Sequence, residues 1–146
     1  MSYGDNEFKR KGIALEADTC EMIVAELQAK GYKVYAKKSS LDEDRIDKID
    51  YYLIFDDSTP FHGMTKFPID IKVGDTYTVI NSIGENTLQC SKSTFIIFRF
   101  NNKLHWALER HLKEWVEKNP QMLRESYNLD GSKYIKVKSF PYFNIF

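Results

Sequence analysis

The sequence predicts an α/β or α+β domain in which helices flank a central mixed β-sheet. Apolar runs of strand length alternate with amphipathic helical segments, and turn residues separate them. Aromatic residues reach 14%, which favours strands and a well-filled core. A length of 146 residues suits one core, so we expect a single domain over residues 1–146.

The first predicted element is a helix over residues 13–30, which ends at Gly31 because glycine is favoured just after a helix. Glu16 falls inside the apolar stripe of this helix. A glutamate on a core-facing stripe is costly unless it is paired, protonated, bound to metal or placed at the rim of the core. At about 100° per residue, the stripe comprises Ile13, Ala17, Cys20, Ile23, Val24 and Leu27.

Strand-like runs dominate the middle of the chain. Residues 37–48 between them are polar and loop-like, and residues 76–80 have a composition that could extend the sheet. Because proline lacks an N–H, we expect either that this strand lies at an edge of the sheet or that Pro68 lies among the first residues of the strand. The predicted strands span residues 32–36, 50–55 and 67–73.

The rest of the chain continues the alternation of strands and helices. Residues 82–92 are expected to form a short helix or a loop. Residues 95–100 are almost wholly apolar, which predicts a strand buried on both faces. Asn101 and Asn102 form a turn into a strand over residues 103–107. The last elements are a helix with apolar positions at Leu108, Leu112, Trp115 and Val116, and a strand over residues 134–138.

A possible catalytic constellation follows from strand geometry. Side-chain alternation places Asp70 and Lys72 on one face of their strand. Asp50 opens the preceding strand, which can pair antiparallel with it; Asp47 is an alternative, and we prefer Asp50 because it opens the apolar run directly. Glu16 could reach the same place from a helix packed on the sheet. Carboxylates of this kind suit Mg²⁺, and a lysine can orient or activate an attacking water.

These residues resemble a known signature. The order of Asp50 and then Asp70-Ile71-Lys72 resembles the PD-(D/E)xK motif of restriction-endonuclease-like nucleases. The run Arg-Lys-Gly-Ile-Ala-Leu-Glu that ends at Glu16 is similar to the start of small Holliday-junction resolvases. In those proteins a basic-basic-Gly run precedes the helix that carries a metal-site glutamate.

The resemblance implies a restriction-endonuclease-like core and a metal-dependent endonuclease that hydrolyses DNA phosphodiester bonds. It implies that Asp50 and Asp70 are the principal Mg²⁺ ligands, that the carbonyl of Ile71 is a further ligand, and that Lys72 is the catalytic lysine. Glu16 would bind the metal directly or through water. Mn²⁺ is expected to substitute for Mg²⁺.

The charge balance limits where nucleic acid can bind. Lys plus Arg and Asp plus Glu both number 21, so a DNA surface must be a local basic patch. So short a chain is expected to select DNA by structure rather than by sequence, or with the help of a partner, and a homodimer would place two sites against two strands. The candidate phosphate contacts flank the Glu16 helix and are Lys9, Arg10, Lys11, Lys37 and Lys38.

Two other functions remain open, namely an RNase and a non-catalytic binding or inhibitory protein on the same fold. The polar start of the chain lacks the apolar region of a signal peptide. No apolar run approaches the roughly 20 residues of a membrane span. We therefore expect a cytoplasmic protein with no membrane partner.

Overall fold

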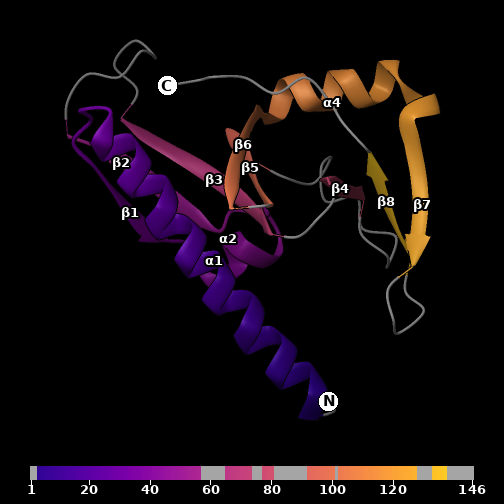
Figure 1. Ribbon diagram of the computed structural model, residues 1–146, viewed down its shortest axis with the longest axis horizontal. Coiled ribbons are helices and arrows are strands. Elements are labelled where there is room, and N and C mark those ends of the chain that lie inside the picture. Colours follow the sequence, from indigo (N-terminus) through magenta and orange to yellow (C-terminus); the bar gives the residue numbers. More distant parts are fainter. Residues whose placement is uncertain are drawn as a thin grey trace.

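The computed structural model describes residues 3–56, 65–73, 77–80, 92–100, 102–127 and 133–137 (Figure 1). The helices in these ranges are α1 (Tyr3–Ala29), α2 (Leu41–Arg45) and α4 (Glu109–Lys118), followed by a 3₁₀ turn over Pro120–Met122. The strands are β1 (Val34–Lys38), β2 (Tyr51–Phe55), β3 (Lys66–Val73), β4 (Tyr77–Ile80), β5 (Phe95–Phe100), β6 (Lys103–Leu108), β7 (Leu123–Tyr127) and β8 (Lys133–Val137).

Five of the strands form a mixed sheet in the order β1-β2-β3-β5-β6. The pairs β1–β2, β2–β3 and β5–β6 are antiparallel, whereas β3 and β5 run parallel. Tyr51 of β2 lies opposite Ile69 of β3, which in turn lies opposite Phe95 of β5. The predicted central mixed sheet is therefore confirmed, as is the antiparallel pairing of the strands that follow Asp50 and carry Asp70.

Pro68 lies in β3, which is a central strand, so the edge position that we expected is wrong. The carbonyl of Pro68 accepts a hydrogen bond from the Thr94 N–H at 2.8 Å, and β5 begins at the next residue, Phe95. Pro68 has no N–H to donate, and this costs no strand hydrogen bond because pairing with β5 begins one residue later, at Ile69. The alternative expectation, a position among the first residues of the strand, is confirmed.

A second sheet of three antiparallel strands has the order β4-β8-β7. Residues 76–80 could have extended the central sheet, but the part that the structure describes, residues 77–80, is β4 and belongs to this second sheet. The predicted strand over residues 134–138 corresponds to β8, whereas β7 was not predicted because its sequence, Leu-Arg-Glu-Ser-Tyr, lacks an apolar run. In Figure 1 the second sheet lies on the far side of β5 and β6 from β1.

Helix α1 begins at Tyr3 rather than at residue 13, so the basic-basic-Gly run lies inside the helix and does not precede it. Its other end agrees with the prediction. The helix stops at Ala29, and Gly31 has a φ of +97°, a left-handed conformation that glycine adopts without strain. The strand after it is displaced by two residues from the predicted 32–36 and runs from Val34 to Lys38.

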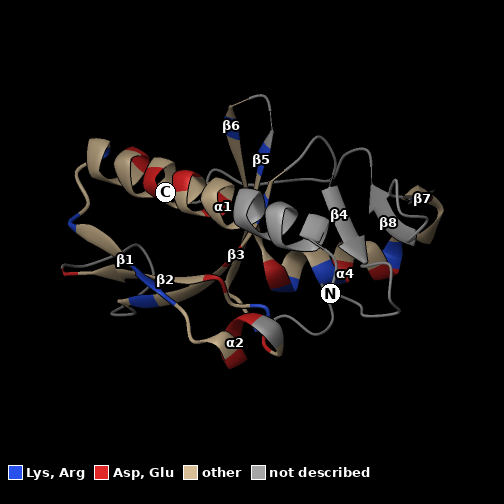
Figure 2. Cartoon of the chain, turned by 90° about the horizontal axis from the view of Figure 1, so that it is seen from below, with Lys and Arg blue, Asp and Glu red and all other residues tan. Residues whose placement is uncertain are grey.

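One face of the five-stranded sheet packs against α1, and this contact forms the core (Figures 1 and 2). Ile23 and Leu27 of the predicted stripe are fully buried, whereas Ile13 is 62% exposed because that part of α1 extends past the sheet. Edge-to-face and tilted ring contacts continue through the core across four strands. The rings belong to Phe55, Phe67, Phe95 and Trp106.

The remaining strand predictions agree with the structure where it describes the chain. The last predicted helix corresponds to α4, except that Leu108 is the final residue of β6 and the helix begins at Glu109. Ile96 and Ile97 of β5 are both buried, so this strand is covered on its two faces, and the turn residue Asn102 has a φ of +57° before β6 begins. Residues 82–91 lie outside the described residues. None of the described helices combines the length and the apolar character that a membrane crossing requires.

Candidate active site

The candidate site lies where β2 and β3 diverge. Their register pairs Tyr51 with Ile69, and the Asp50 N–H still donates to the Ile69 carbonyl at 2.9 Å. Beyond that point the Ile71 N–H donates to Oδ2 of Asp50 at 2.6 Å. The Asp50 carboxyl thus takes the place of the main-chain acceptor that a longer β2 would offer, and it fixes the start of the fork between the strands.

Two acidic residues are buried in this fork. Asp50 is 5% exposed and Asp70 is 2% exposed, which is uncommon for aspartate. Lys72 Nζ lies 3.3 Å from Oδ1 of Asp70. The second oxygen of Asp70, Oδ2, is buried and has no hydrogen-bond partner among the described residues. A buried polar atom that stays unpaired costs free energy, which makes Asp70 a candidate functional residue.

Side chains reach the fork from both faces of the sheet. Ile69 and Ile71 belong to the core under α1, so strand alternation directs Asp70 and Lys72 toward the opposite face. Glu16 comes from α1, yet its carboxyl interacts electrostatically with both Asp70 and Lys72. Glu16 therefore lies within electrostatic range of Asp70 and Lys72, although α1 covers the opposite face of β3.

The electrostatics of Glu16 reflect this crowded position. Burial raises the pKa of its carboxyl above the ordinary value, and the negative charges of Asp44 and Asp70 raise it further. Lys38 and Lys72 act in the opposite direction. Glu16 is half-buried, and it shares its surroundings with two acids and two lysines.

Asp50 shows the largest effect. Burial, the charge of Asp70 and a hydrogen bond with the Asp44 side chain raise the pKa of Asp50 to about 9, although the hydrogen bond from Ile71 opposes this. Burial alone would lower the pKa of Lys72, but Asp70 and Asp50 outweigh it and raise that pKa above its ordinary value. Both effects have one cause, which is an excess of acidic groups in a poorly solvated space.

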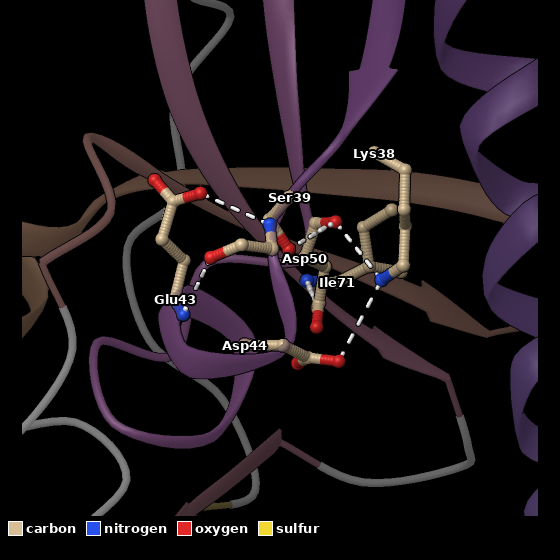
Figure 3. Close-up of polar contacts among 7 residues, drawn as sticks. Lys38, Ser39, Glu43, Asp44, Asp50 and Ile71 are labelled. Carbon is tan, nitrogen blue, oxygen red and sulfur yellow. Dashed lines mark hydrogen bonds and ion pairs between the residues drawn. The ribbon is translucent and has the colours of Figure 1, made fainter.

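Asp44 is a member of the site that the sequence reasoning missed. It lies on α2, within the segment expected to be a loop. Ser40 Oγ accepts a hydrogen bond from the Glu43 N–H at 3.1 Å, and Glu43 Oε1 accepts one from the Ser40 N–H at 3.0 Å (Figure 3). The Tyr52 hydroxyl donates to the other Glu43 oxygen. The Ser-x-x-Glu spacing of this capping box is a known helix-start signal, and it could have revealed α2.

Helices α1 and α2 approach the fork from opposite sides, and α2 carries a concentration of acidic residues (Figure 2). Lys38, at the end of β1, lies among these groups (Figure 3). Its Nζ donates to the Asp50 carbonyl at 3.0 Å, lies 3.6 Å from Oδ2 of Asp44, and stands 4.7 Å above the centre of the Tyr51 ring. The neighbouring Lys37 is exposed and points to the other face of the strand.

The structure distinguishes the two aspartates that the sequence left as alternatives. Asp50 lies beside Asp70 in the fork. Asp47 instead forms an ion pair with Lys92 at 3.2 Å, and its carbonyl accepts a hydrogen bond from the Lys92 N–H. The Asp47 side chain is 27% exposed, so it lacks the burial that makes Asp50 unusual. The geometry therefore favours Asp50 as the site residue.

The carboxylates in the fork are oxygen donors of the type that a hard cation prefers. Within the described ranges, no three His, Cys, Asp or Glu side chains are arranged to hold one metal ion together. Mg²⁺ commonly uses one or two carboxylates and keeps several waters, so Asp50 and the unpartnered oxygen of Asp70 could hold it. The carbonyl of Ile71 points to the same side of β3 as its N–H, which faces Asp50.

The structure thus brings together Asp50, Asp70 and Lys72, and it places Glu16 within electrostatic reach of them. Lys38 joins the site, whereas Lys37 does not. The side chains of residues 9–11 are outside what the structure describes. No family model, curated protein or solved structure matches the chain, so any function has to be argued from these residues.

Proposed function

We propose that this protein is a metal-dependent endonuclease of the restriction-endonuclease-like fold that hydrolyses DNA phosphodiester bonds. One observation carries the proposal: Asp50 and Asp70 are buried side by side at a strand fork, and one Asp70 oxygen has no partner among the described residues. A cation bound there would offset the cost of burying these acids. The resemblance to the PD-(D/E)xK motif supports the same assignment.

Each residue has a role that its position supports. Asp50 and Asp70 would hold the cation, with the Ile71 carbonyl as a further oxygen, and Glu16 would complete the shell through water. The chemistry that bound Mg²⁺ supplies is a lower pKa for a coordinated water and neutralisation of charge that develops on the phosphate. Mn²⁺ has similar ligand preferences and is expected to support the reaction.

Lys72 would act on the attacking water and on the phosphate. Its ammonium is held 3.3 Å from Asp70, and its side chain is 26% exposed, so it lies at the boundary between the buried acids and solvent. A protonated lysine in this place donates hydrogen bonds to a water or to a phosphate oxygen as negative charge increases. Asp70 fixes the direction from which Lys72 donates.

The test is a nuclease assay with the Lys72→Ala variant as its control. Supercoiled, linear, single-stranded and branched DNA, together with RNA, are incubated with Mg²⁺ or Mn²⁺. We expect DNA cleavage by the wild type that requires the metal, and a loss of about 100-fold or more in the variant. Cleavage of RNA alone would make the protein an RNase. A wild type that cleaves neither polymer would support a binding protein on the same fold.

A control for folding makes this test specific. Lys72→Met retains most of the apolar stem and removes the ammonium, so it should preserve packing and still lose cleavage. If Lys72→Ala and Lys72→Met cleave DNA at the wild-type rate, the assignment of the active site is wrong, even if the protein is a nuclease.

A further inference from the structure

Lys38 differs from the other lysine of the site in how firmly it is held. Lys72 is paired with a buried carboxylate and is 26% exposed, whereas the Lys38 side chain is 46% exposed. The partner of Lys38 in its ion pair, Asp44, is itself 39% exposed. An ion pair between two such exposed groups is weak, and a competing anion can replace it.

The hydrogen bond from Lys38 to the Asp50 carbonyl is also dispensable. That carbonyl accepts two further hydrogen bonds, one from the Ser39 N–H at 3.2 Å and one from the Ser39 hydroxyl at 2.9 Å (Figure 3). A carbonyl oxygen has two lone pairs, so Ser39 alone satisfies it. Lys38 can therefore leave without exposing a buried acceptor, which is an arrangement suited to a group that changes partners.

The acidic groups around the fork favour a role for Lys38 in binding an anion. Glu16, Asp44, Asp50 and Asp70 surround the site, and a polyanion would be repelled unless a cationic group met it at the entrance. An ammonium has three N–H donors, and the described residues offer Lys38 two polar acceptors. At least one donor remains for an oxygen from outside the protein.

We propose that Lys38 binds a phosphate of the substrate next to the bond that is cut, after it leaves Asp44 and the Asp50 carbonyl. This inference rests on the proposed nuclease function and deepens it by naming the group that binds the substrate backbone. It also separates Lys38 from Lys37, which the sequence placed in the same class. The side chain of Lys37 is exposed on the other face of β1 from Lys38.

Lys66 is a matched control within the same sheet. Its Nζ stands 4.3 Å above the ring of Tyr52, as Lys38 stands above Tyr51, but the two tyrosines are consecutive residues of β2 and so face opposite sides. Replacement by methionine removes the charge from either lysine and keeps an apolar chain over the ring. The pair Lys38→Met and Lys66→Met therefore compares two similar changes. Lys38 contacts Asp44 and the Asp50 carbonyl, whereas Lys66 is the first residue of β3, four residues before Asp70.

The experiment measures binding of fluorescent duplex and single-stranded DNA at several salt concentrations, with Ca²⁺ in place of Mg²⁺, and then cleavage kinetics with Mg²⁺. For Lys38→Met we expect the Kd and the KM to rise about tenfold. The slope of log Kd against log salt should fall by about 1, which corresponds to the loss of one phosphate contact. The kcat should change much less. Lys38→Arg should retain the slope, and Lys66→Met should match the wild type.

Three other outcomes overturn the inference, and a fourth refutes the nuclease proposal alone. If Lys38→Met lowers kcat and leaves the salt slope unchanged, Lys38 has a structural role in holding Asp44 and Asp50. If Lys66→Met changes the slope equally, the effect belongs to the overall charge of the protein. A wild type that binds DNA without cleaving it would refute the nuclease proposal, and the slope would still decide the role of Lys38. A wild type that binds no DNA would refute both.

Discussion

The two ends of the β2–β3 pair are buried to a similar degree and have opposite chemistry. At one end, Leu53 and Phe67 are fully buried in the apolar core under α1. At the other end, Asp50 and Asp70 are 5% and 2% exposed. Burial at the first end stabilises the fold, because apolar surface leaves water. Burial at the second end costs free energy, because charged groups lose their hydration.

This difference distinguishes residues that stabilise the fold from residues that are candidates for function. Asp50 accepts a hydrogen bond from the Ile71 N–H, but an oxygen of the adjacent Asp70 has no partner among the described residues. Ionisable groups with strongly perturbed pKa values concentrate at functional sites. The comparison therefore predicts that substitutions at the apolar end lower stability, whereas substitutions at the fork lower activity and raise stability.

The largest change in stability is expected at the apolar end. Phe67→Ala removes a ring that contacts the rings of Phe55 and Phe95. We expect a loss of about 3–5 kcal/mol in the free energy of unfolding, because it removes a large buried side chain and leaves a cavity. Urea denaturation measures the change. Phe67→Leu should lose less, and a Phe67→Ala variant as stable as the wild type would contradict the core described above.

The next largest change is expected at the fork, with the opposite sign. Asp50→Asn keeps an oxygen for the Ile71 N–H and removes a carboxyl whose pKa is raised to about 9 from an ordinary value of 3.8. A carboxyl with a raised pKa in the folded state stabilises the protein fully below about pH 4, and this contribution is lost as the pH rises toward 9. At pH 7 and without metal, we expect Asp50→Asn to be more stable than the wild type, on the order of 2 kcal/mol.

The pH dependence and the response to metal test this explanation together. The stability difference between Asp50→Asn and the wild type should increase from pH 5 to pH 8 in urea denaturation with a chelator present. Mg²⁺ should raise the stability of the wild type and have little effect on the variant, since a ligand that binds only the folded state stabilises it. A variant that is less stable than the wild type at every pH would show that the Asp50 carboxyl is structural.

The same comparison explains how much of the protein could be predicted from its sequence. Apolar patterning was sufficient for β2, β3 and β5, because each has a run of buried residues such as Leu53, Phe67 and Ile97. It was also sufficient to place Asp70 and Lys72 on one face. Patterning failed where stability comes from other interactions, as in α2, whose hydrogen-bonded cap and contact with Tyr52 replace an apolar stripe.

The arrangement of the site depended on features that local patterns do not encode. Glu16 was predicted from its place in an apolar stripe, but its proximity to Asp70 and Lys72 depends on how α1 packs on the sheet. Asp44 and Lys38 reach the fork from separate elements, and only the tertiary structure brings them to the main chain and carboxyl of Asp50. The sequence therefore predicted the acids in the strands better than the groups around them.

The smallest effect is expected at Asp47, which competed with Asp50 in the sequence. Its ion pair with Lys92 joins a side chain that is 27% exposed to one that is 72% exposed. Such a pair contributes little in water, so Asp47→Asn should change the free energy of unfolding by less than about 0.5 kcal/mol. Cleavage should continue at the wild-type rate, whereas Asp50→Asn should abolish it. Urea denaturation and the DNA assay with Mg²⁺ measure the two properties.

This pair of conservative substitutions is the most direct test of the fork, because both exchange an aspartate for asparagine within one short segment. They differ in burial and in whether the carboxyl faces Asp70. If Asp47→Asn abolished cleavage and Asp50→Asn did not, the buried fork would be a structural feature and the reaction would take place on the exposed side of the segment. If Asp50→Asn alone lost cleavage and gained stability, the Asp50 carboxyl would be required for activity and would lower the stability of the fold.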